Sequence, residues 1–153
     1  MIPAMRAYVG LGANLGDRER TLRAAVESLA ANPQIEVVAV SSLSETDPVG
    51  LVTDQPRFLN GAVALETSLS ARALLNVLLE TEAAFGRTRD GPPGGPRTLD
   101  LDLLLHGDDA IDEPGLQVPH PRLRERPFVL EPLRELGWTP SGRGYTAEDE
   151  PPR

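Results

Sequence analysis

Two aspartates within one short apolar run are the residues of this sequence whose type and spacing best suit chemistry. Asp100 and Asp102 stand two positions apart in the segment 98–105, which reads Thr-Leu-Asp-Leu-Asp-Leu-Leu-Leu. The segment is too short to cross a membrane and has the length of a buried strand. Because side chains alternate along a strand, both carboxylates should project from one face, roughly 7 Å apart. Oxygen ligands at this spacing suit Mg²⁺, which completes its coordination with waters and substrate phosphates.

An edge strand is the alternative explanation of these charges, because exposed carboxylates discourage one sheet from adding to another. An edge strand rarely carries leucine as continuously as residues 99–105 do. We therefore expect a strand in the interior of the sheet, with the carboxylates on one face and Leu99, Leu101 and Leu103 packed on the other.

Arginine is the sole source of strong positive charge, because all 15 Lys or Arg residues are Arg. Without Lys, a P-loop of the Walker type and Schiff-base chemistry are both excluded. A phosphate group would have to be bound by arginine, whose planar fork suits it. Arg87, Arg89 and Arg97 flank one loop rich in Gly and Pro, and three further arginines lie in residues 122–126.

Length and composition indicate one globular domain. The chain has 153 residues, of which 40% are hydrophobic, enough for a single core. We expect this domain to span residues 1–138 and the segment 139–153, rich in Gly, Pro and charge, to be a flexible tail. Cysteine is absent, so disulfides and thiolate chemistry are excluded.

The charge and the hydropathy of the chain limit the partners and the cellular location that we expect for it. A formal net charge of -8 opposes binding to a nucleic-acid backbone. No apolar run is long enough to span a membrane, and the N-terminal residues lack the pattern of a signal peptide. We therefore expect a cytoplasmic protein that binds neither nucleic acid nor membranes.

The pattern of apolar residues predicts six main elements. Asp17 can cap the first helix, Ser70 starts the second, and Gly86 can end it. The order strand, helix, strand, strand, helix, strand is that of a ferredoxin-like α/β (α+β) sandwich. Additional strands, loops and a short helix at about 128–136 should follow it. The expected elements lie at residues 6–12, 17–31, 35–42, 58–65, 70–86 and 98–105.

The glycines of the first strand and turn allow two interpretations. The segment 10–16, Gly-Leu-Gly-Ala-Asn-Leu-Gly, follows a strand and opens a helix, as a dinucleotide-binding fingerprint does. Its third glycine comes one residue late, and a Rossmann domain needs more parallel strands than this chain provides. Either the glycines allow a tight turn against a sheet or they form a loop beside a ligand.

Four segments, in their order along the chain, resemble the 6-hydroxymethyl-7,8-dihydropterin pyrophosphokinase family. They are the glycine segment 10–16, Asp-Gln-Pro-Arg-Phe-Leu-Asn at 54–60, Gly-Pro-Arg-Thr-Leu-Asp-Leu-Asp at 95–102 and Val-Pro-His at 118–120, together with Arg126 and Phe128. The resemblance covers about residues 7–137. It implies transfer of the β,γ-pyrophosphoryl group of ATP to the hydroxymethyl group of 6-hydroxymethyl-7,8-dihydropterin, with release of AMP, in folate biosynthesis. The partners would be ATP and the pterin, served by two Mg²⁺ ions.

The resemblance also implies roles for single residues. Asp100 and Asp102 would bind both metal ions, and Arg87 and Arg97 would grip the ATP phosphates as further catalytic residues. Glu82 would be an active-site residue that could contact Asn14. The nucleotide side would consist of Glu82, Arg89, Leu103, His120 and Arg126. The pterin would be bound by Thr46, Val49, Phe58, Asn60 and Phe128, the two Phe stacking on its ring.

Two other functions stay open at this point. A ferredoxin-like domain can be a non-catalytic module that binds a small molecule, and such a module would not need the paired aspartates. A Mg²⁺-dependent enzyme could instead transfer the γ-phosphoryl group and release ADP. We expect the chain to act as a monomer.

Overall fold

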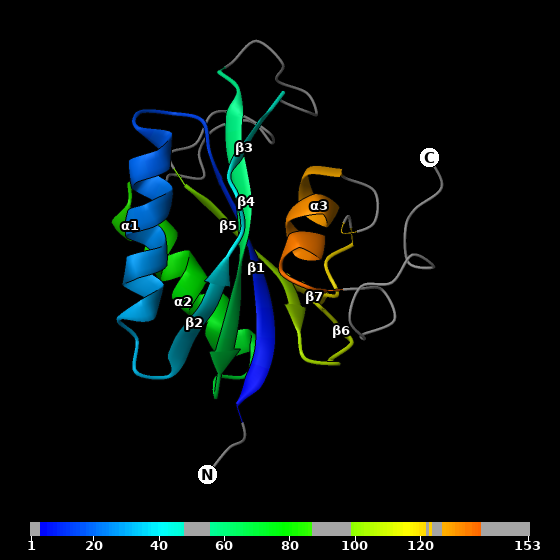
Figure 1. Cartoon of the computed structure of the whole chain (residues 1–153). Coiled ribbons are helices and arrows are strands. Elements are labelled where there is room, and N and C mark those ends of the chain that lie inside the picture. Colours follow the sequence, from blue (N-terminus) through cyan, green and yellow to red (C-terminus); the bar gives the residue numbers. More distant parts are fainter. Residues whose placement is uncertain (1–3, 48–55, 87–98, 122, 124–126, 139–153) are drawn as a thin grey trace.

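The computed structural model describes residues 4–47, 56–86, 99–121, 123 and 127–138, and its main body is one antiparallel sheet with helices on both faces (Figure 1). The four long strands follow the order β2-β4-β1-β5, and short β3 pairs with β4. The strands of this sheet are β1 (Met5–Ala13), β2 (Ile35–Val40), β3 (Ser44–Thr46), β4 (Phe58–Thr67) and β5 (Asp100–His106). The remaining elements are α1 (Arg18–Ala30), α2 (Ala71–Ala84), the hairpin β6 (Ile111–Glu113) and β7 (Leu116–Val118), and α3 (Pro127–Glu135).

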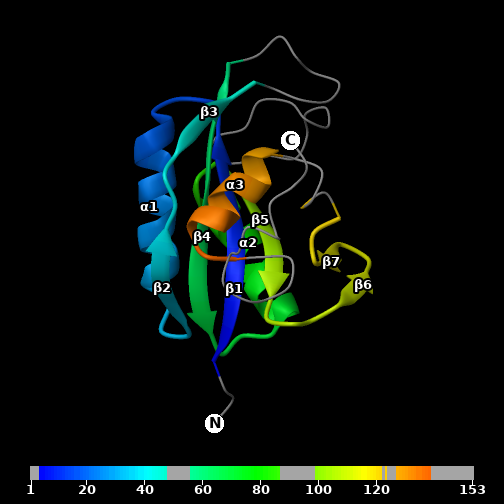
Figure 2. The same ribbon diagram turned by 45° about the vertical axis from the view of Figure 1, so that its right-hand side comes forward.

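The order of these elements confirms the ferredoxin-like α+β prediction. Helices α1 and α2 cover one face of the sheet, and α3 lies against the other (Figures 1 and 2). The predicted additional strands and short helix are present as β6, β7 and α3. No helix in the described ranges is long and apolar enough to cross a membrane.

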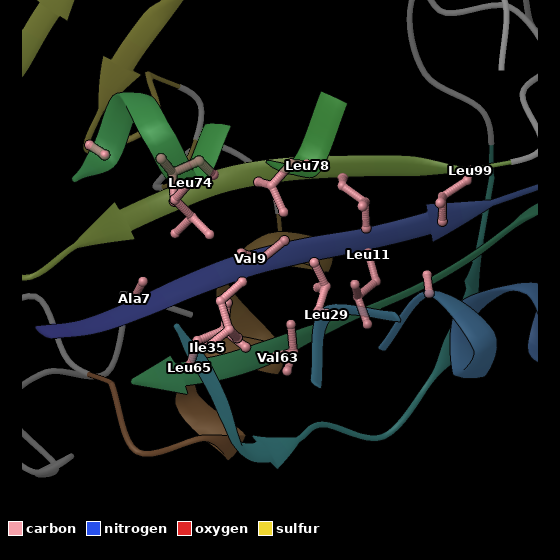
Figure 3. Packing of buried hydrophobic residues seen from close by; sticks show 14 of the residues in the cluster. Ala7, Val9, Leu11, Leu29, Ile35, Val63, Leu65, Leu74, Leu78 and Leu99 are labelled. Atoms are coloured by element: carbon pink, nitrogen blue, oxygen red, sulfur yellow. The ribbon is translucent and has the colours of Figure 1, made fainter. Parts of the chain in front are cut away.

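The core has two parts, one on each face of the sheet. The larger part joins β1, β4 and β5 to α1 and α2 through fully buried residues such as Val9, Leu65 and Leu78 (Figure 3). The smaller part joins the opposite face to α3, with Leu104 and Leu133 buried there. A sheet covered on both faces can carry apolar side chains at nearly every position of its strands.

Both long helices begin at the predicted caps. The side chain of Asp17 accepts a hydrogen bond from the Arg20 amide at 3.2 Å, and the Ser70 hydroxyl accepts one from the Ala73 amide at 3.1 Å. Each bond satisfies a helix amide that has no partner within the helix. Helix α2 ends just before Gly86, whose φ of +84° is left-handed.

The expectation that the two aspartates lie on an interior strand is wrong. In the described sheet β5 occupies the end of the order, with β1 as its strand neighbour. Its leucines are nevertheless buried, because α2 covers one face of the strand, and Leu104 and Leu105 belong to the core part that includes Leu133 of α3. The chain after β7 also covers part of the edge, since the His120 amide donates to the Leu104 carbonyl at 2.9 Å.

A buried histidine fixes the C-terminal end of β5. His106 is 2% exposed, with Nδ1 at 2.7 Å from an Asp109 carboxylate oxygen and Nε2 at 2.8 Å from the Leu69 carbonyl. Leu69 directly precedes the cap of α2, so the imidazole joins the end of β5 to the start of that helix. The relative placement of α2 and β5 matters because both elements line the cavity described next.

Candidate active site

A cavity of about 950 Å³ lies beside the edge strand β5, between α2 and the β6–β7 hairpin. Five residues predicted from the sequence to act in metal or nucleotide binding line it together: Glu82, Asp100, Asp102, Leu103 and His120. They come from a helix, a strand and the segment after the hairpin. The fold therefore brings these predicted residues to one place.

The carboxylate pair has the predicted orientation. Leu99, Leu101 and Leu103 belong to the core beneath α1 and α2, and Asp102 is exposed while Asp100 is half-buried. Two carboxylates facing one cavity can supply part of the coordination of Mg²⁺, whose other positions suit phosphate and water oxygens. The described residues contain no cluster of three or more Asp, Glu or His placed to hold a metal ion. Within the described part of the chain, the two carboxylates therefore fit a magnesium ion whose remaining ligands come from a phosphorylated ligand and water.

A buried carboxylate on α2 supports the strand between the two aspartates. Glu82 is 2% exposed, and its Oε2 accepts a hydrogen bond from the Leu101 amide at 2.8 Å. Leu101 lies between Asp100 and Asp102, so this bond fixes the backbone that carries both. The predicted contact between Glu82 and Asn14 stays a prediction; the Asn14 amide donates to the Pro56 carbonyl at 3.1 Å.

Truncating Glu82 should therefore weaken the fold as well as the site. We expect Glu82→Ala to lower the free energy of unfolding by about 1–3 kcal/mol, because the Leu101 amide loses its acceptor inside the protein. Urea denaturation monitored by circular dichroism would measure the loss. Glu82→Gln is the control, since it keeps an acceptor oxygen, and equal stability of the Ala variant and the wild type would contradict the assignment.

A second cavity, of about 360 Å³, lies between β3 and α3 and brings together Thr46 and Asn60. The Asn60 side-chain amide donates to the Thr46 hydroxyl. Phe58 is half-buried and lies opposite Thr46 in the pairing of β3 with β4. Three of the residues predicted to bind the pterin are thus neighbours in the structure.

The register of the sheet connects the two cavities. Gly12 of β1 lies opposite Asn60 of β4 on one side and opposite Asp100 of β5 on the other. Directly opposed residues point to the same face of a sheet. Asn60 and Asp100 therefore share one face, two inter-strand spacings or about 10 Å apart, with a residue that has no side chain between them.

The two interpretations of the glycine segment can now be separated by position. Gly10 and Gly12 lie within β1 and pair with Asp102 and Asp100, whereas Gly16, with a φ of +69°, lies in the turn before α1. A Cβ atom at position 12 would come within 2.9 Å of the Asn60 Oδ1. Gly16 thus serves the turn, and Gly12 gives Asn60 room on the face that carries the site.

Other predicted residues are not described by the structure. Helix α3 includes Phe128, but the position of its side chain is not among the described features. Val49, Arg87, Arg89, Arg97 and Arg126 lie outside the described residues.

The hairpin β6–β7 contributes to the first cavity and was not predicted to do so. Asp112 and Gln117 line the cavity and are joined by a hydrogen bond of 3.1 Å from the Gln117 amide. A signal for the hairpin is present in the sequence, since Pro114-Gly115 is a typical turn dipeptide between two apolar positions. No local sequence pattern indicates that this hairpin lies beside β5.

This α+β fold places paired carboxylates beside one cavity and a polar pocket two strands away on the same face of the sheet, an arrangement suited to an enzyme that transfers a group from a phosphorylated ligand to a second small molecule. Residues 8–137 match the sequence profile of the family described as 7,8-dihydro-6-hydroxymethylpterin-pyrophosphokinase. The chain belongs to this family, as the resemblance predicted. It is an ATP-dependent pyrophosphokinase of folate biosynthesis that transfers a pyrophosphoryl group from ATP to hydroxymethyldihydropterin.

Similar proteins include several whose identity is near half. The 2-amino-4-hydroxy-6-hydroxymethyldihydropteridine pyrophosphokinase of Bacillus subtilis is 50% identical over 130 residues, which are 85% of this chain and 77% of that protein. The protein of the same name from Pseudomonas aeruginosa is 47% identical over 131 residues, which are 86% of this chain and 80% of that protein. The folate synthesis bifunctional protein of Arabidopsis thaliana is 46% identical over 128 residues, 84% of this chain and 26% of that protein.

Proposed function

We propose that the reaction takes place between two half-sites on the sheet. The pterin half-site consists of Thr46, Phe58 and Asn60, and the nucleotide half-site consists of Glu82, Asp100, Asp102, Leu103 and His120. The register that places Gly12 between Asn60 and Asp100 is the observation that carries this proposal. It sets the two half-sites about 10 Å apart on one face, a distance that a pterin and a triphosphate can bridge.

The nucleotide half-site would bind the ATP phosphates at the aspartate pair. Asp100 and Asp102 would hold two Mg²⁺ ions, which when bound neutralise phosphate charge and orient the β-phosphorus for in-line attack. Glu82 positions these carboxylates through the Leu101 amide. Arg87 and Arg97 would bind phosphate oxygens, and Leu103, His120, Arg89 and Arg126 would contact the rest of the nucleotide.

The pterin half-site would hold the flat ring by its faces and its edge. Phe58 and Phe128 would stack on the ring, and Thr46, Val49 and Asn60 would bind its polar edge. The hydroxymethyl oxygen would then form a bond to the β-phosphorus of ATP and lose its proton to water. The bond from that phosphorus to the oxygen shared with the α-phosphorus breaks, and AMP leaves.

Nucleotide products test this proposal directly. Purified protein incubated with Mg²⁺, ATP and 6-hydroxymethyl-7,8-dihydropterin should form AMP, in a pterin-dependent reaction that chelation of the metal abolishes. Anion-exchange chromatography separates AMP from ADP, and pterin-dependent ADP would show γ-phosphoryl transfer instead. Binding of ATP or pterin without turnover would show a non-catalytic module.

The organisation of the whole chain is a further part of the proposal. We propose one pyrophosphokinase domain over residues 1–138, supported by the family match over residues 8–137. The monomeric state and the cytoplasmic location stay predictions from the sequence.

A further inference from the structure

Strand β3 carries a residue of the pterin half-site but is attached to the sheet by few backbone contacts. It has three residues, and its described pairing is with β4 alone, Ser44 opposite Asn60, Glu45 opposite Leu59 and Thr46 opposite Phe58. Short strands at a sheet edge are weakly held by their ladder alone. Something besides the ladder must fix Thr46 in place against Asn60.

The Glu45 carboxylate joins β3 to two other segments. Its Oε1 accepts a hydrogen bond from Arg18 Nη2 at 2.5 Å, and its Oε2 accepts one from Arg57 Nη1 at 3.0 Å. Arg18 is the first residue of α1, and Arg57 directly precedes β4. The Arg18 guanidinium lowers the pKa of the Glu45 carboxyl, so this carboxylate is ionised at neutral pH.

Two more contacts close the group of side chains. Arg18 Nη1 donates to the Arg57 carbonyl at 2.8 Å, and Arg57 Nε donates to an Asp47 carboxylate oxygen at 3.1 Å. The start of α1, the middle of β3, the residue after β3 and the residue before β4 are therefore joined in one network. A single exposed ion pair contributes little, but several charges in one network with bonds to the backbone contribute more.

The side chains of Glu45 and Thr46 project from opposite faces of β3, although Glu45 and Asp47 also line the second cavity. Glu45 lies opposite Leu59, which packs against the core beneath α1 and α2. Because side chains alternate along a strand, Thr46 faces the other way, with its partner Phe58. The Glu45 carboxylate is thus held by Arg18 and Arg57, while Thr46, the next residue of the strand, bonds to Asn60 in the cavity.

We propose that Glu45, with Arg18 and Arg57, positions Thr46 and the start of β4 for the pterin, so that it determines pterin affinity without taking part in nucleotide binding. Glu45 is a positioning residue, acting through Thr46 and Asn60. The inference rests on the proposed pterin half-site.

The test compares Michaelis constants for the two substrates in single variants. Glu45→Gln keeps the shape of the side chain and removes its charge, so the KM for pterin should rise about 5- to 10-fold while kcat and the KM for ATP change less than about twofold. High salt screens exposed ion pairs. The difference in the KM for pterin between the variant and the wild type should therefore become smaller as the salt concentration rises.

The matched control is Glu66→Gln, which removes another ion-paired carboxylate, bound to Arg6 at 2.7 Å near the far end of β4. It should leave both Michaelis constants unchanged. An unchanged pterin KM in Glu45→Gln, an equal rise in both Michaelis constants, or a loss confined to kcat would overturn the inference. An Asn60→Ala variant distinguishes a failure of this inference from a failure of the proposed pterin half-site. If Asn60→Ala also leaves the KM for pterin unchanged while AMP is formed, the pterin half-site itself is wrongly placed.

Discussion

Replacing Asp102 with asparagine should lower kcat for AMP formation by roughly 10²–10³-fold, because in the proposed mechanism the side chain loses the charge that would hold a metal ion against the phosphates. Asp102 is exposed, and asparagine has nearly the same shape, so the variant should fold normally. Steady-state rates at saturating ATP and pterin, with thermal unfolding of the same samples, would measure both effects.

A neighbouring aspartate provides the control for this loss. Asp108 is exposed in the turn that follows β5 and does not line the cavity. Asp108→Asn removes the same charge and should leave kcat unchanged. An Asp102 variant that retained half of the wild-type rate would exclude the carboxylate pair as the metal site.

Adding a methyl group at Gly12 should weaken pterin binding more than nucleotide binding. The new Cβ would lie 2.9 Å from Asn60 Oδ1, so the Asn60 side chain, which donates a hydrogen bond to Thr46, would have to shift. Strain of about 1–3 kcal/mol at such a site corresponds to a rise of roughly 5- to 150-fold in the KM for pterin. Isothermal titration with pterin in the presence of a non-hydrolysable ATP analogue would report the same change as a dissociation constant.

Gly10→Ala is the matched variant on the same strand. A Cβ there would meet Leu104 at 3.5 Å and Asp102 at 3.7 Å, which are ordinary contact distances. Its effect on pterin binding should be several-fold milder than that of Gly12→Ala. Equal effects would mean that space beside Asn60 is not what position 12 provides.

Local signals were sufficient to predict the long strands and the helices of the fold, whereas the short strand β3 lies in a segment that reads as irregular. Asp17 and Ser70 were recognised as caps because each hydroxyl or carboxylate precedes an apolar helical stripe, and the structure confirms both. The place of β5 in the sheet was predicted wrongly for a physical reason. Leucines buried by layers above and below a strand look the same in the sequence as leucines of an interior strand.

The sequence predicts those parts of the site whose residues lie close together in one segment. The spacing of Asp100 and Asp102 fixes their common face, and the structure confirms it. The row from Asn60 through Gly12 to Asp100 depends on the register of three strands, which the sequence does not encode in any one segment. The Glu45 network was missed for the same reason, since its carboxylate binds an arginine 27 residues away.

The backbone of β1 also sets the distance between the two proposed half-sites. Two steps of inter-strand hydrogen bonding separate Asn60 from Asp100, and the length of such a step is a property of the peptide group, about 4.8 Å in any sheet. Substitutions of side chains can change how tightly each substrate is held, but they leave this interval nearly constant. In the proposed arrangement of the half-sites, the distance between the pterin ring and the phosphate chain would follow from this spacing, and a substrate with a longer arm between its ring and its hydroxyl would place the attacking oxygen past the phosphorus.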